Sequence, residues 1–277
     1  MWNPIKIYKL SKIIWKRGEN YNHYDEDMDL TAADVAREIN SQMLFPSNLL
    51  VVSKLRKTPR GRDVLWGRND KSIEYQYEKI LPVITNKEVM DKYAPNTVGG
   101  HYHHLIKQWS FDELWDRRFQ QDVDEGFIGW IDEVRSNISR HIFLCHDFMH
   151  VLFRYDTTQI GESCIQGVQY VMSRHWGAWY LAHVMALKNC YKYKTWEPLR
   201  IVREAIRNAK KVKLEFWYLN PLEILGEDVE ETRNKYNIES PTKFLKFAAK
   251  HRESFRFDSI HPEYNDVKIK STIAECV

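Results

Sequence analysis

The stretch that most constrains the fold of this chain is residues 146–162, HDFMHVLFRYDTTQIGE. His146 and His150 are four positions apart, so a helix places both side chains on one face. Apolar residues surround them, which predicts a buried helix: Ile142, Phe143, Met149, Val151, Leu152 and Phe153. Residues 155–158 form a short polar break with good N-cap residues, and a second helix is expected after it. Glu162 lies about one turn into that second helix.

These side chains are expected to converge across an antiparallel helix hairpin. His150 and Glu162 are both six positions from Asp156, and residues equidistant from a turn face each other in such a hairpin. Imidazole and carboxylate together suit a divalent transition metal such as zinc, iron, cobalt or manganese. The predicted ligands are therefore His146, His150 and Glu162. Asp147, which can turn toward the same face, is predicted either to bind the metal or to orient a ligand.

The carboxylates carry this prediction, because a single H-x-x-x-H pair is usually an accident of composition. Four ligand-type groups on a buried surface would be costly to desolvate unless they are paired or coordinated. The motif differs from the H-E-x-x-H of zinc proteases, because Asp147 follows the first histidine and no glutamate stands beside it to act as the base.

Hydrophobic periodicity predicts helices along the rest of the chain and few, isolated strand signals, so the expected fold class is all-α, with a single multi-helix domain. The expected helices are 30–42, 72–81, 95–121, the motif pair 127–155 and 158–175, then 178–191, 196–215, a short helix within 219–236, and 241–251. The helix over 72–81 is expected to end before Pro82.

Several residues outside the motif have predicted packing roles. Gly99 and Gly100 remove two side chains from one helix and let another backbone or a ligand come close. Gly161 and Gly167 would let their helix press against a neighbour or a lipid tail. His183 is expected to be a hydrogen-bonded core residue rather than a ligand.

Charge and composition limit the partners. The net charge of +3 gives no case for nucleic acid from bulk charge. The four cysteines, at 145, 164, 190 and 276, form no C-x-x-C pair, which favours a reducing compartment and buried thiols. No apolar run approaches the ~18 residues of a membrane-spanning helix, so a soluble or peripheral protein is expected.

Three regions are predicted along the chain: residues 1–44 with a basic leader, a polar linker and a short helix, residues 45–251 as the all-α metal-binding domain, and residues 252–277 as a tail. Residues 1–17 carry five Lys or Arg and no acid, which suits a segment in a membrane interface. A solvated leader and a mitochondrial presequence are the alternatives. A basic face on helix 196–215 is either solvated or holds anionic lipid or a substrate carboxylate: Arg200, Arg203, Arg207, Lys210 and Lys211.

The complete pattern, H-D-x-x-H followed by eleven residues and Glu162, resembles the signature of the fourth Coq protein family of ubiquinone (coenzyme Q) biosynthesis. Looser matches flank it at residues 96–102 (NTVGGHY), 203–208 (REAIRN) and 221–238. The resemblance covers about residues 47–240. It implies that the domain is an all-α, Coq-type protein whose metal is zinc, and that it acts on polyprenylated benzoate precursors at a membrane.

The activity that the resemblance implies is metal-dependent oxidative decarboxylation at ring carbon one of a polyprenylated 4-hydroxybenzoate, the work of a carbon–carbon lyase. Zinc can bind the carboxylate and stabilise charge, whereas iron or cobalt can also handle oxygen. The implied partners are a quinone-type lipid, other ubiquinone biosynthesis enzymes and a membrane surface, and a homodimer is open. That surface is the cytoplasmic face of the bacterial inner membrane, or the matrix side of the mitochondrial inner membrane in a eukaryote.

The polyprenyl tail needs an apolar groove. For most of the apolar residues that could line one, packing in the core is the simpler explanation. The helices from residue 163 to 191 offer these candidates: Val168, Val171, Met172, Trp176, Trp179, Leu181 and Met185.

Two other functions stay open. In the first, the protein binds polyprenylated intermediates and organises other biosynthetic enzymes, and the metal is structural. In the second, His146 and Asp147 form the core of an HD-type phosphohydrolase. That class also needs an upstream histidine and a downstream aspartate, for which His101 or His104 and Asp228 are available. The phosphohydrolase leaves the spacing of the motif glutamate unexplained.

Overall fold

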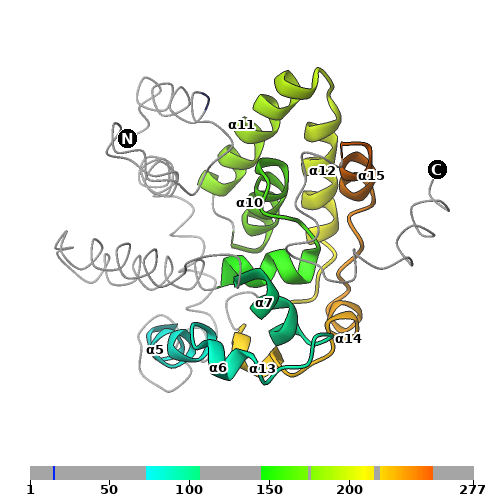
Figure 1. Ribbon diagram of the computed structural model, residues 1–277. Coiled ribbons are helices and arrows are strands. Elements are labelled where there is room, and N and C mark those ends of the chain that lie inside the picture. The colour runs from blue at the N-terminus through cyan, green and yellow to red at the C-terminus, as the bar shows by residue number, and fades with distance from the viewer. Residues whose placement is uncertain (1–14, 16–72, 107–144, 174–175, 215–218, 252–277) are drawn as a thin grey trace, which may run out of the picture.

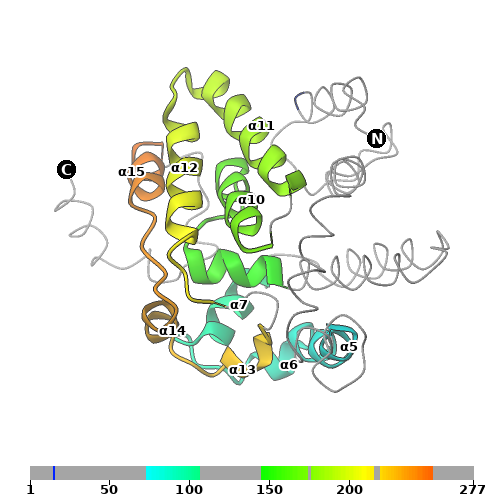
Figure 2. The same cartoon turned by 180° about the vertical axis from the view of Figure 1, so that it is seen from behind.

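The computed structural model describes Trp15 and residues 73–106, 145–173, 176–214 and 219–251. Within these residues every regular element is a helix, and an isolated backbone bridge joins Thr97 to Asp228. The predicted all-α fold class is therefore confirmed. Figures 1 and 2 show the arrangement of the helices from opposite sides.

The labelled helices follow the chain in this order: α5 (Ile73–Ile84), α6 (Lys87–Met90), α7 (Val98–Ile106), α10 (Gln159–Ser173), α11 (Trp176–Tyr193), α12 (Glu197–Ala209), α13 (Pro221–Ile224), α14 (Val229–Lys235) and α15 (Thr242–Lys250). Residues 145–153 form a further helix between α7 and α10, drawn without a label in bright green across the middle of Figure 1.

Helices α10, α11 and α12 pack against one another, and α15 packs on α12. The sequence of α12 explains this position, because one face is apolar and buried while the opposite face is basic and exposed. The buried apolar face consists of Ile201, Val202, Ala205 and Ala209. Such burial contributes about 25 cal/mol per Å² of apolar surface removed from water.

Two of the predicted close-packing glycines lie where elements meet. A Cβ atom on Gly167 of α10 would stand 3.1 Å from Cγ1 of Ile206 on α12, so the missing side chain lets these helices approach. The backbone N–H of Gly99 donates a hydrogen bond of 2.8 Å to the carbonyl of Leu225, and a Cβ atom there would stand 2.9 Å from that oxygen. The close backbone approach predicted at Gly99 is thus confirmed.

The predicted end of the first described helix is wrong, because α5 runs through Pro82 to Ile84. Proline inside a helix costs about 3 kcal/mol. Ile80 and Ile84 are fully buried on either side of it, and this packing offsets the cost. Tertiary contact has therefore overridden the local signal.

The predicted helix 196–215 also ends early, at Ala209. The chain beyond it turns to another partner, since the N–H of Lys213 donates to the carbonyl of Tyr236 at 2.9 Å. The side chain of Asn237 donates to the carbonyl of Lys211 at 3.1 Å. These contacts replace the last helical turns.

Several predictions fall outside the described residues. They include the leader and linker of residues 1–44, except Trp15, and the tail of residues 252–277. The predicted helices over 107–121 and 127–144 also fall there. The division into three regions stays a prediction. Among the described helices, none is long and apolar enough to cross a bilayer.

Candidate metal centre

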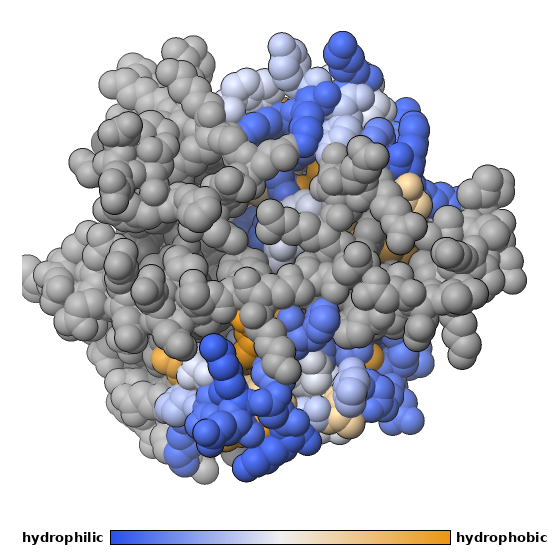
Figure 3. All heavy atoms as spheres, in the orientation of Figure 1, coloured by the Kyte–Doolittle hydropathy of each residue, from blue (hydrophilic) through white to orange (hydrophobic). Residues whose placement is uncertain are grey.

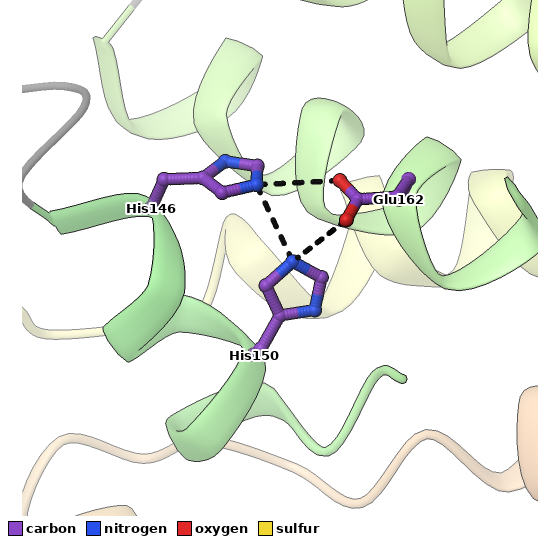
Figure 4. Close-up of side chains that lie close together, drawn as sticks. All are labelled: His146, His150 and Glu162. Carbon is purple, nitrogen blue, oxygen red and sulfur yellow. Dashed lines mark hydrogen bonds and ion pairs between the residues drawn. The ribbon is translucent and has the colours of Figure 1, made fainter. Parts of the chain in front are cut away.

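Three of the predicted ligands meet in the structure (Figure 4). Nε2 of His146 lies 3.2 Å from Oε2 of Glu162, and Nε2 of His150 lies 3.3 Å from Oε1 of the same carboxylate. The two Nε2 atoms are 3.3 Å apart. Two atoms bound tetrahedrally at about 2.0–2.1 Å from zinc lie roughly 3.3–3.4 Å apart, so these separations fit a divalent metal held between the two imidazoles and the Glu162 carboxylate.

The sequence between the two helices sets the position of Glu162. The first helix ends at Arg154, which adopts a left-handed backbone with φ of 60°. Asp156 then accepts hydrogen bonds on Oδ1 from the N–H and the hydroxyl of Thr158, at 3.2 and 2.5 Å, and this turn begins α10. Glu162 therefore stands in the first turn of α10, facing the histidines.

Gly161 is required by the same turn. A Cβ atom at this position would lie 1.9 Å from the backbone oxygen of Asp156, closer than any side chain permits. The missing side chain at Gly161 makes room for Asp156 of the preceding turn, and not for a neighbouring helix or a lipid tail as predicted. This tight turn brings the next residue, Glu162, to the site.

The outer nitrogens of both histidines are held by groups that the sequence analysis missed. Nδ1 of His150 donates a hydrogen bond of 2.9 Å to the carbonyl of Tyr155, which leaves Nε2 facing Glu162 with a lone pair in the neutral ring. Nδ1 of His146 lies 2.9 Å from the side-chain amide of Gln169. A half-turn of the side-chain amide exchanges its oxygen and nitrogen. The amide oxygen of Gln169 can then accept a hydrogen bond from the Nδ1–H group of His146 when Nε2 binds a metal.

Burial and charge tie the triad together. The side chain of His150 is 1% exposed, whereas His146 and Glu162 are 22% and 17% exposed, so one side of the triad meets solvent. Burial alone would lower the pKa of His150, but the neighbouring Glu162 carboxylate outweighs it and raises that pKa to about 9. Burial would raise the pKa of Glu162, but His150 and His146 hold it well below its usual range. Without metal, a proton on His150 compensates the carboxylate, and a divalent cation can replace that proton.

Asp147, the fourth predicted ligand, does not belong to this cluster. Its charge still acts locally, because it helps to raise the pKa of His150. It also adds to the effect of burial in raising the pKa of Tyr102, whose ring stacks on Phe148 with centroids 4.2 Å apart. A supporting electrostatic role fits Asp147 in this geometry, and its role as a ligand stays a prediction.

Other described histidines lie outside the triad. Nδ1 of His183 donates to the carbonyl of Trp179 at 2.7 Å, so the predicted hydrogen bond is present, although the side chain is half-buried rather than in the core. Nδ1 of His103 lies 3.4 Å from the carboxylate of Asp91. His101 and His104 are not part of the triad cluster.

The aspartate that a phosphohydrolase would need is engaged elsewhere. Oδ1 of Asp228 accepts the N–H groups of Glu230 and Glu231 at the start of α14, and Oδ2 accepts the side-chain amide of Asn96 at 2.8 Å. These hydrogen bonds stabilise the carboxylate and lower the pKa of Asp228. The geometry thus favours Glu162, rather than Asp228, as the carboxylate of the site.

The cysteines beside the motif are buried thiols, as predicted. Cys145 and Cys164 are fully buried, and burial raises the pKa of each well above its usual range. A thiolate ligand is therefore disfavoured at both positions.

A second element fixes the end of the helix that carries the histidines. Arg233 of α14 is buried and donates hydrogen bonds from Nε to the carbonyl of Leu152 at 3.1 Å, and from Nη2 to the carbonyl of Val151 at 2.7 Å. Glu230 bridges Arg233 and Arg154. This contact holds the last helical turn immediately before Tyr155, whose carbonyl orients His150.

Comparison with known proteins finds similarity of fold. A solved structure from Nostoc punctiforme, described as a "putative ubiquinone biosynthesis protein", matches with a TM-score of 0.54 and 12% sequence identity. The match covers 87% of this chain and 100% of that chain. At this identity the likeness concerns the fold alone. No family model matches the chain, and no curated protein matches it.

Proposed function

We propose that this protein binds one divalent metal through His146, His150 and Glu162 and acts in ubiquinone biosynthesis. The observation that carries the proposal is the convergence of two Nε2 atoms and one carboxylate at separations that fit a metal. The H-D-x-x-H and glutamate spacing, which resembles the Coq signature, supports the pathway. The all-helical fold, shared in outline with the Nostoc protein, agrees with it.

The proposed reaction replaces the ring carboxylate of a polyprenylated 4-hydroxybenzoate by a hydroxyl group and releases carbon dioxide. This is a two-electron oxidation, so it needs an oxidant that also supplies the oxygen atom, such as molecular oxygen. A bound metal supplies a positive charge that can hold the substrate carboxylate, and iron or cobalt also supplies redox chemistry. Three protein ligands leave room for substrate at the metal, as catalytic sites require. The partial exposure of His146 and Glu162 supports access from one side.

The protein's own residues prepare the site for this role. Tyr155 and Gln169 fix the imidazole rings so that both Nε2 atoms face the carboxylate. Val168, Leu181 and Met185, considered for the polyprenyl tail, are fully buried and belong to the core. Three of the other candidates are half-buried and remain available for contact with a tail: Val171, Met172 and Trp179.

The experiment is complementation of a strain that lacks the gene, read by mass spectrometry of its lipids. The deletion strain is expected to lose ubiquinone and to accumulate a polyprenylated intermediate that keeps its ring carboxylate. His150→Ala is expected to fail in restoring ubiquinone, whereas the control His183→Ala, which removes an imidazole outside the triad, restores it. If His150→Ala restores ubiquinone while folded and metal-free, the role is organising rather than catalytic. Normal quinone in the deletion strain would contradict the pathway assignment.

A further inference from the structure

The exposed large hydrophobic side chains of the described residues gather at one place. They are Trp15, Leu187, Tyr191 and Trp196. Leu187 and Tyr191 are one turn apart on α11, and Trp196 follows in the connection to α12. Tyr191 is 78% exposed and Trp196 66% exposed, far more than a core aromatic. The ring of Trp15, from the basic segment 1–17, lies 6.0 Å from that of Tyr191.

The same region is basic. Residues 187–203 contain five basic residues and one acid, Glu197, although the whole chain has a net charge of only +3. Lys192 and Lys194 are exposed directly beside the aromatic residues. Figures 1 and 2 show the α11–α12 connection at one extremity of the described helices, and Figure 3 shows white to blue surface there. We call Leu187, Tyr191, Lys192, Lys194 and Trp196 the α11–α12 tip.

We propose that the α11–α12 tip docks onto an anionic lipid membrane. Tyr and Trp have apolar rings with polar edges and favour the boundary between lipid and water. Lysine is depleted in protein–protein interfaces, whereas lysines near an anionic membrane are attracted to it and can extend their amines toward the headgroups. The mixture of aromatic residues and lysines on a protruding end therefore matches a membrane surface better than a protein partner.

The tip is joined directly to the helix that carries Glu162. Asn189, two residues before Tyr191, donates a hydrogen bond of 3.2 Å to the side chain of Gln159, at the start of α10. A membrane at the tip thus lies next to the element of the proposed metal site, which suits a lipid substrate. The docking proposal itself rests on the exposed residues and holds whether or not the triad binds metal.

The test is flotation of the full-length protein with vesicles. One set consists of phosphatidylcholine alone and the other of phosphatidylcholine mixed with phosphatidylglycerol. Wild-type protein is expected to float with the anionic vesicles and to dissociate as salt is raised. The double variant Lys192→Gln/Lys194→Gln is expected to bind these vesicles about 10- to 30-fold more weakly. Tyr191→Ser/Trp196→Ser is expected to weaken binding by about tenfold while the dependence on salt persists.

A matched control carries the same charge change at the far end of the molecule. Lys87 and Lys92 are exposed on and beside α6, opposite the tip in Figure 1. Lys87→Gln/Lys92→Gln is expected to float like the wild type, and helical circular dichroism verifies the fold of every variant. If both tip variants bind the anionic vesicles as tightly as the wild type does, the proposal is overturned. If the wild type binds neither the neutral nor the anionic vesicles, the proposal is also overturned, and an acidic protein surface is left as the partner.

Discussion

At the scale of single residues, His150 connects the charge of the site with its capacity for metal. Its ring is buried, donates to Tyr155 and faces Glu162. Since its pKa of about 9 lies above the ordinary value near 6.5, the protonated pair stabilises the metal-free fold below about pH 6.5. That contribution is lost as the pH rises through about 9. A metal needs the neutral ring, so metal and proton compete at this nitrogen.

Metal affinity is therefore expected to rise with pH. Below about pH 9, each decrease of one pH unit should weaken binding by about tenfold, because one proton must leave His150 for each metal bound. Competition with a chromophoric chelator at pH 6, 7 and 8 measures this slope. An affinity that is flat over this range would show that metal binding releases no proton from His150, which would contradict the protonated His150–Glu162 pair of the metal-free site.

A second residue-scale prediction concerns Gly161. Gly161→Ala places a Cβ atom against the backbone oxygen of Asp156, which cannot move aside without opening the turn before Glu162. Overpacking of this kind costs about 1–3 kcal/mol. The matched control is Gly226→Ala, because nothing lies within 4 Å of a Cβ atom at Gly226. Chemical unfolding should show a loss for Gly161→Ala only, and equal stability of the two variants would contradict the described turn.

At the scale of elements, features set by neighbouring residues could be predicted from the sequence, whereas contacts between residues far apart in the chain could not. Helix periodicity and the two-histidine spacing are local signals; the periodicity placed α10 and α11 correctly, and the spacing predicted that His146, His150 and Glu162 come together. Gln169 is seven positions after Glu162 on the same helix, so its facing position could have been noticed. The contact of Arg233 with the carbonyls of Val151 and Leu152 joins residues about eighty positions apart, and no local pattern announces it.

That distant contact is expected to support the metal site. Arg233→Met leaves two buried carbonyls without their donor, at a cost of about 1–3 kcal/mol, and loosens the chain before Tyr155. Both the free energy of unfolding and the metal affinity should fall. Arg203→Met, on the exposed face of α12, is the control and should change neither. If Arg233→Met lowers stability but keeps wild-type metal affinity, the contact of Arg233 with the two carbonyls stabilises the fold without positioning the site.

At the scale of the whole molecule, the fold is shared with the Nostoc protein at only 12% identity. Packing of apolar helix faces, rather than particular residues, is what such distant chains have in common. Within this fold the proposed metal ligands come from the helix of residues 145–153 and from α10, so a metal bound there would link two elements of the core. Removal of the metal by a chelator is expected to lower the midpoint of thermal unfolding. A metal present at 100 times its dissociation constant contributes about 2.7 kcal/mol to stability, and an unchanged midpoint would contradict this link.

The most direct test of the central claim is the metal content of the purified protein, measured by inductively coupled plasma mass spectrometry. Wild-type protein and the control His183→Ala are expected to contain about one divalent transition metal per chain, as the one triad found among the described residues implies. His150→Ala and Glu162→Gln are expected to contain almost none, while their helical circular dichroism stays close to that of the wild type. Full metal occupancy in both variants, or no metal in wild-type protein supplied with zinc, iron, cobalt and manganese, would contradict the metal centre.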